Sequence, residues 1–271
     1  HPAQGANGHT CYWRRDLIRN LIAGILLLLM LGACSSKPTK SDAEFKGDPA
    51  EINAQLGIEY MRQGMYEAAS EKLNKAVKQN PELQLAQVSL AILSEKLGED
   101  NEAEKHYRKA YSINRKDPVT LNAYGQFLCR KGELEKADQM FVVAASDPLY
   151  KYPELILTNA GICAMDRPDV VLADTYFRKA LQRNPSYPPA LREMVRSSFA
   201  QQKYLATRAY LQRLQGVATL SPEFLWIGVQ TESALQDLNA VSSYSMVLKN
   251  QHPEASETQA LIEWESKLGD R

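Results

Sequence analysis

Apolar and small side chains recur every three or four residues from about residue 50 to the C-terminus, which is the spacing of one face of an α-helix. Glycine, proline and short polar clusters interrupt this pattern at close intervals and predict turns between the helices. Residues 50–83, for example, contain two such apolar stripes with a Gly64 between them. The hydrophobic pattern therefore predicts a chain of many short helices arranged in hairpins.

The helical pattern repeats itself along the chain with the period of a tetratricopeptide unit, about 34 residues. In residues 50–83 the pair Leu56-Gly57 is followed by Tyr60, Ala69 and Pro81 at the spacing of such a unit. Equivalent small, aromatic and proline positions predict units at 50–83, 84–117, 118–153, 154–187, 188–221 and 222–255, the third unit two residues longer and the last two weaker. Residues 256–271 are expected to form a capping helix with a polar outer face.

The repeated small residues explain how such units assemble. Gly or Ala at the crossing of the two helices in a unit lets their backbones approach closely, and larger side chains fill the space between units. One unit cannot bury its apolar face alone, so neighbouring units must stack. The predicted fold is all-α: a right-handed tetratricopeptide-repeat superhelix of about six helical hairpins plus a C-terminal capping helix. Solenoids of this kind usually bind other proteins.

The N-terminal part of the chain has the layout of a secretory signal. Arg14, Arg15 and Arg19 precede an apolar run of eleven residues, Leu21–Leu31, which is too short for a membrane-spanning helix of about 20 residues. Leu31-Gly32-Ala33-Cys34 resembles a bacterial lipobox, in which the cysteine is acylated after cleavage. A buried core helix that ends in cysteine is the alternative.

On the lipobox interpretation, residues 1–33 are removed and Cys34 carries the lipid. Residues 34–49 are polar and are expected to form a flexible tether between the lipid and the folded domain at 50–271. Ser35, rather than Asp, follows the cysteine, and in the pathway that this segment resembles such a residue directs a lipoprotein to the outer membrane. The expected location is therefore the outer membrane, facing the periplasm.

Charge and motifs argue against catalysis and against nucleic-acid binding. The chain has 32 Lys and Arg against 32 Asp and Glu, and no basic stripe that would follow a nucleic-acid backbone. It has no H-E-x-x-H, no G-x-S-x-G and no phosphate-binding glycine loop. Apart from the first 33 residues, only His106 and His252 are present, and neither has convergent partners. We therefore expect no enzyme activity, no metal, no cofactor and no small-molecule substrate.

Two cysteines remain once Cys34 is acylated and Cys11 is removed with the signal. Cys129 and Cys163 are separated by one repeat length and lie in the first helices of adjacent units, which pack side by side. An oxidising periplasm would permit a disulfide between them. The alternative is two buried free thiols that act as small hydrophobic side chains.

The partner surface is expected on the first helices, which line the concave face of tetratricopeptide arrays. In that register six apolar residues of units one and two face a groove: Ala54, Ile58, Met61, Leu85, Val88 and Ile92. Such a groove would hold an apolar peptide or helix. The alternative is that these residues belong to the core, because an apolar stripe at helical spacing is usually buried.

Two long segments carry a family resemblance. The stretches LNAYGQFLCRKGELEKADQMF (Leu121–Phe141) and SDPLYKYPELILTNAGICA (Ser146–Ala164) resemble the type IV pilus biogenesis lipoproteins called PilW or PilF. The resemblance implies a pilotin, an outer-membrane lipoprotein that binds the secretin PilQ, works with other pilus assembly proteins, and helps the secretin to localise and multimerise. A disulfide at the positions of Cys129 and Cys163 also occurs in part of that family. The alternatives are lipoprotein scaffolds of β-barrel assembly or adaptors of peptidoglycan enzymes.

Overall fold

The computed structural model describes residues 47–166 and 169–269. Within these ranges the chain forms thirteen α-helices and no strand, and residues Asp48–Arg271 make one compact unit. None of the described helices is long and apolar enough to cross a membrane. The predicted signal, Cys34 and nearly all of the predicted tether lie outside the described residues.

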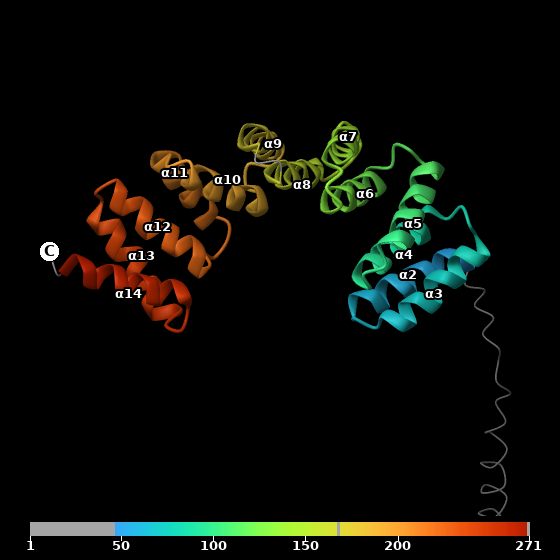
Figure 1. Ribbon diagram of the computed structural model, residues 1–271, viewed down its shortest axis with the longest axis horizontal. Coiled ribbons are helices and arrows are strands. Elements are labelled where there is room, and N and C mark those ends of the chain that lie inside the picture. The colour runs from blue at the N-terminus through green and yellow to red at the C-terminus, as the bar shows by residue number, and fades with distance from the viewer. Residues whose placement is uncertain (1–46, 167–168, 270–271) are drawn as a thin grey trace, which may run out of the picture. The chain divides into compact units, whose positions relative to one another are not determined.

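The helices follow one another as antiparallel pairs (Figure 1). They are α2 (Pro49–Arg62), α3 (Tyr66–Gln79), α4 (Gln84–Lys96), α5 (Asp100–Ile113), α6 (Pro118–Arg130), α7 (Leu134–Ala145), α8 (Pro153–Met165), α9 (Val170–Arg183), α10 (Pro188–Ala200), α11 (Tyr204–Gln215), α12 (Pro222–Ala234), α13 (Leu238–Gln251) and α14 (Ser256–Gly269). Each of the six units expected from the sequence contains one pair, and α14 follows as a single helix. The fold is all-α, a tetratricopeptide superhelix.

The starts of the first helices follow from local sequence. Pro49, Pro118, Pro153, Pro188 and Pro222 each stand in the first turn of a helix, where the missing N–H costs nothing. Before α6, the Asp117 carboxylate accepts a hydrogen bond of 2.8 Å from the backbone N–H of Thr120 and so caps the helix. These signals place the first helix of each unit at a repeating position in the chain.

In five of the hairpins the described turn contains a left-handed residue. In the first three units this residue is glycine, with φ values of 76° at Gly64, 77° at Gly98 and 75° at Gly132. In the last two units it is Gln202, at φ 55°, and Gln236, at φ 59°. A side chain in this region costs energy that glycine does not pay.

Replacing Gln202 by Gly is therefore expected to raise the free energy of unfolding by about 0.5–1 kcal/mol, because glycine relieves the left-handed strain. Urea unfolding followed by circular dichroism measures the change. Lys203→Gly is the control, since Lys203 has φ −83° and glycine gains nothing there. Equal effects of the two substitutions, or a loss of stability in Gln202→Gly, would contradict the explanation.

The two helices of a hairpin cross where a small residue faces a large one. A Cβ added to Gly125 would lie 2.8 Å from a ring carbon of Phe141, and one added to Gly161 would lie even closer to the ring of Phe177. Real Cβ atoms do not approach ring carbons so closely, so only glycine permits these crossings. Both phenylalanines are 1% exposed and belong to one apolar core that runs through most of the array.

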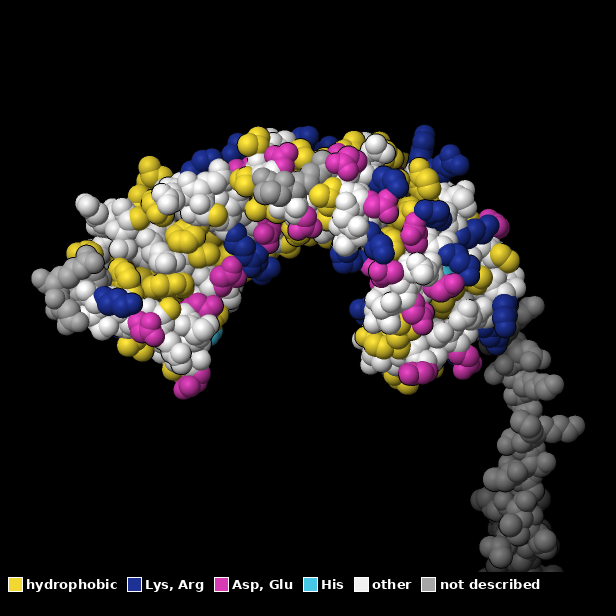
Figure 2. Space-filling model, in the orientation of Figure 1, with side chains coloured by type: hydrophobic (Ala, Val, Ile, Leu, Met, Phe, Trp, Pro, Cys, Tyr) yellow, Lys and Arg dark blue, Asp and Glu magenta, His cyan; other side chains and the backbone are white. Residues whose placement is uncertain are grey.

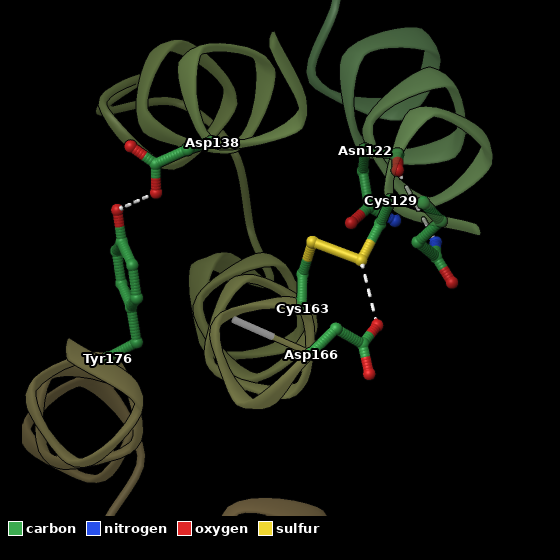
Figure 3. The surroundings of a disulfide bond; sticks show 7 residues. Asn122, Cys129, Asp138, Cys163, Asp166 and Tyr176 are labelled. Atoms are coloured by element: carbon green, nitrogen blue, oxygen red, sulfur yellow. Dashed lines mark hydrogen bonds between the residues drawn. A yellow bond between two sulfur atoms is a disulfide. The ribbon is translucent and has the colours of Figure 1, made fainter. Parts of the chain in front are cut away.

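Polar contacts join successive hairpins across the otherwise apolar junctions. Glu95 of α4 bonds Tyr107 of α5 and pairs with Arg130 of α6. Asp138 of α7 accepts a 2.6 Å hydrogen bond from the hydroxyl of Tyr176 in α9 (Figure 3). Further along, Asp174 of α9 accepts hydrogen bonds from Ser197 (2.5 Å) and Gln201 (3.2 Å), and Arg208 of α11 pairs with Glu232 of α12. These contacts help to fix how units two to six sit on one another.

Candidate protein-binding surface

Two of the six residues expected in the groove lie in the core instead. Ala54 is 0% exposed and packs with Ala76 and Ala86, while Val88 is 6% exposed and belongs to the main core. The groove assignment is therefore wrong for both. The physical reason is that α2 and α4 pack against each other and against their own partners, so this side of each helix is covered.

The other four expected residues are partly or fully accessible. Ile58, Met61 and Ile92 are half-buried, Met61 against a small cluster around Leu73 and Ile92 against the main core. Leu85, near the start of α4, is exposed at 41% of its surface. Of the residues expected in the groove, the sequence thus located one exposed apolar side chain. Three others lie at the margin of the core.

The sequence reasoning missed a continuation of this surface in units three and four. Val119 of α6 takes the place of Leu85 one repeat later, and Leu155 of α8 takes it in the repeat after that, once the insertion in unit three is allowed for. Both are exposed, and so are Ile162 and Met165 on α8. We call Leu85, Val119, Leu155, Ile162 and Met165 the first-helix surface. Extending the Leu85 slot by one and two repeats would have found Val119 and Leu155. The Ile92 slot, extended by two repeats, would have found Ile162, and the Met61 slot, extended by three, would have found Met165.

The first-helix surface has a helical layout on α8. Leu155, Ile162 and Met165 are separated by seven and three residues, which puts them on one face of the helix. In Figure 1, α6 and α8 lie on the inner side of the array between α5 and α10, with α7 and α9 on the outer side. The exposed apolar stripe therefore belongs to the helices that line the inner side.

A disulfide joins the two helices that carry most of this surface. Cys129 of α6 and Cys163 of α8 are bonded, with their Cα atoms 5.8 Å apart, well inside the range that a disulfide spans (Figure 3). Beside it the side-chain amide of Asn159 donates a hydrogen bond of 2.9 Å to Asn122 Oδ1. The two free thiols considered from the sequence are thus not what the structure contains.

Charged groups on the first helices of units five and six are paired. The Arg196 guanidinium of α10 donates hydrogen bonds of 2.6 and 2.8 Å to the two carboxylate oxygens of Glu223 in α12. These bonds hold the pKa of the Glu223 carboxyl below its usual range. Arg196 also bonds Glu193, so one arginine joins two acidic side chains.

Two histidines lie within the described residues. His106 is half-buried, its Nδ1 lies 2.8 Å from Gln87 Oε1, and burial lowers the pKa of the imidazole. His252 lies in the turn before α14. Among the residues that the structure describes, no three His, Cys, Asp or Glu side chains gather into a group that could hold a metal ion.

Comparisons with known proteins agree with this arrangement. The tetratricopeptide repeat model matches residues 50–83 and 86–117. The chain is 26% identical over 245 residues to the type IV pilus assembly protein PilF of Pseudomonas aeruginosa. This alignment covers 89% of the chain and 97% of that protein. The crystal structure of PilW, described as a widely conserved type IV pilus biogenesis factor, superimposes with a TM-score of 0.70 at 28% identity, over 80% of this chain and 99% of that one.

These similarities support a tetratricopeptide-repeat protein of the PilW/PilF kind. The solved structure of Pseudomonas aeruginosa PilF gives the same TM-score of 0.70 at 26% identity and covers 79% of this chain and 97% of that one. The similarity to PilW and PilF thus extends over nearly the full length of these relatives, and the resemblance expected from the sequence is confirmed.

In this protein, a charge introduced at Leu85 and one introduced at Val88 should have very different effects on stability. Val88→Asp is expected to lower the free energy of unfolding by about 3 kcal/mol or more, because it buries an unpaired carboxylate in the core. Leu85→Asp is expected to change it by less than about 0.5 kcal/mol, since the site is exposed in the first turn of α4. Thermal unfolding followed by circular dichroism measures both. Similar losses in the two variants would show that Leu85 is not on an open surface.

Proposed function

We propose that this protein acts in type IV pilus assembly as a pilotin, an outer-membrane lipoprotein that binds the secretin PilQ and promotes its localisation and multimerisation. The observation that carries the proposal is the full-length similarity to PilF and PilW, whose names place those proteins in pilus assembly and biogenesis. It works by binding, without a chemical step. The lipid on Cys34 would supply attachment to the membrane and the superhelix the contact with the secretin.

The first-helix surface supports a binding role. A stripe of exposed apolar side chains along α8, continued by Val119 and Leu85 on neighbouring first helices, can cover an apolar segment of a partner and keep it from aggregating. The Cys129–Cys163 disulfide holds α6 against α8, so little of the surface has to be ordered when a partner binds. Preorganisation of this kind favours affinity without extra contact area.

The experiment that tests this function measures the secretin multimer directly. Outer-membrane fractions are run on a gel without boiling, from cells with and without the gene, and probed for PilQ. We expect the multimer to be lost on deletion and restored by the wild type, but not by Cys34→Ala, because an unlipidated form does not reach the membrane.

The role of the surface is tested with a matched pair of substitutions. Ile162→Lys places a charge on the first-helix surface and is expected to reduce the multimer several-fold. Val171→Lys changes an equally apolar residue that is 79% exposed on α9, on the outer layer, and is expected to leave the multimer unchanged. Equal amounts of multimer in the two variants would show that the first-helix surface takes no part in forming it.

An unchanged amount of multimer after deletion of the gene would contradict the whole pilotin proposal. Co-purification would then separate the two other candidates. A scaffold of β-barrel assembly should bring down a barrel insertase, and an adaptor of peptidoglycan enzymes should bring down a hydrolase or a synthase.

A further inference from the structure

A hollow of about 700 Å³ lies between the fifth and sixth units, away from the first-helix surface. It is bounded by the end of α11 at Gln215, the connecting residues 216–221, the start of α12, and one side of α13. Figure 2 shows hydrophobic side chains gathered over α12 and α13. The volume falls in the range of about 300–1,000 Å³ that small ligand sites have.

The hollow exists because units five and six differ from the regular repeat in the length of a helix and in the position of an aromatic ring. The second helix α11 has 12 residues, as α7 does, whereas α9 and α13 have 14, so the chain leaves the outer layer early and crosses to α12 through residues 216–221. In unit six the ring of Tyr244 packs over Gly228, with its carbons 3.0 Å from where a Cβ would lie. This ring lines the hollow, while the next residue, the small Ser245, is the buried one.

The chemistry of the walls restricts what can bind. Leu220 and Leu225 are buried apolar side chains and Val247 is a half-buried one, and together they make an apolar floor. The polar lining consists of neutral groups, chiefly the exposed amides of Gln215 and Gln251. None of the described residues that line the hollow is charged. A phosphate, a free carboxylate or an ammonium group would lose part of its hydration in the hollow and find no opposite charge there. A charged ligand is therefore disfavoured.

The amides favour a peptide in extended form. Within the described part of the chain neither Gln215 nor Gln251 makes a side-chain hydrogen bond, so both can offer a donor and an acceptor. An extended backbone has unpaired N–H and C=O groups that match this pair, whereas the backbone of a helix has already used them. The apolar floor matches an aliphatic side chain between those backbone groups.

We infer that this hollow is a second binding site, and that it takes an uncharged, extended polypeptide segment of a partner protein with one aliphatic side chain on the floor. The site does not depend on the proposed pilotin function, because it shares no residue with the first-helix surface. It gives the C-terminal units a binding role of their own.

The test uses N-acetyl-L-leucine methylamide, the smallest uncharged probe with a peptide group on each side of a leucine side chain. The full chain, as isolated from cells and held in phospholipid nanodiscs so that no detergent competes, is titrated with the probe by ligand-observed NMR. We expect a Kd of about 1 mM, in line with a fragment of this size. N-acetyl-L-leucine, which carries a free carboxylate, should bind at least about tenfold more weakly.

Two adjacent serines locate the binding. Ser243 and Ser242 are both exposed on α13, and each hydroxyl bonds the backbone carbonyl four residues earlier, but only Ser243 lines the hollow. Ser243→Trp should fill the hollow and raise the Kd at least about tenfold, while Ser242→Trp should leave it within about twofold. The double variant Gln215→Leu/Gln251→Leu should also weaken binding about tenfold, through the lost hydrogen bonds.

Three results would overturn the inference. They are no binding of the methylamide up to about 30 mM, equal effects of the two tryptophan variants, or a free acid that binds as tightly as the methylamide. The last would indicate a site for a chain end instead of an internal segment. Circular dichroism of each variant checks that the helices are intact, and the glutamine variant supplies the result if a tryptophan variant does not fold.

Discussion

Replacing Arg208 by Met is expected to lower the free energy of unfolding by about 3–5 kcal/mol. Arg208 of α11 donates hydrogen bonds of 3.0 and 2.9 Å from Nε to the carboxylate of Glu232 in α12, whose side chain is only 3% exposed. Without the guanidinium, Glu232 stays buried as an unpaired charge between units five and six. Urea unfolding of the wild type and the variant, followed by circular dichroism, measures the loss.

The double variant Arg208→Met/Glu232→Met is the control. Removing both charges leaves apolar side chains of similar volume, and such replacements are often neutral or stabilising. We therefore expect the double variant to recover most of the lost stability. A double variant as unstable as Arg208→Met would show that the loss comes from packing of the arginine stem and not from the unpaired carboxylate.

Opening the Cys129–Cys163 disulfide is expected to lower stability by about 2–4 kcal/mol, because the bond closes a loop of about 34 residues in the unfolded chain. Unfolding of the wild type with and without a reductant gives the difference. Hydrogen exchange should show the loss in α6 and α8, since contacts in a repeat array are mostly between neighbours.

The reductant needs a control for effects unrelated to this bond. Cys129→Ala/Cys163→Ala removes both sulfurs, so its stability should match that of the reduced wild type and should not change on adding reductant. If hydrogen exchange in α12 and α13 speeds up as much as exchange in α6 and α8, the disulfide does not act locally and the prediction is wrong.

The repeat could be predicted because its signals are local. A glycine that meets a phenylalanine of the following helix, as Gly161 meets Phe177, marks the crossing of two helices wherever it occurs, and Pro188 or Pro222 marks the start of the next unit. The two cysteines could be paired for the same reason, since their spacing equals one period. All of these features repeat with the chain and need no knowledge of the packing between distant units.

The binding surface was harder to predict because burial depends on how far each helix is covered by its neighbours. Val88 and Leu85 lie on the same helix three residues apart, yet one is in the core and the other is open to solvent. The hollow in the C-terminal units was harder still. It depends on where α11 ends and on Tyr244 taking the place beside Gly228, and neither departure can be recognised from the regular slots.

The disulfide between α6 and α8 makes the stability of the array depend on the redox state of its surroundings. In a reducing solution Cys129 and Cys163 are thiols, so the centre of the array lacks its cross-link and unfolds more readily. In an oxidising solution the closed bond makes unfolding harder. One covalent bond between two repeats therefore couples the folding equilibrium of this protein to the electron supply around it.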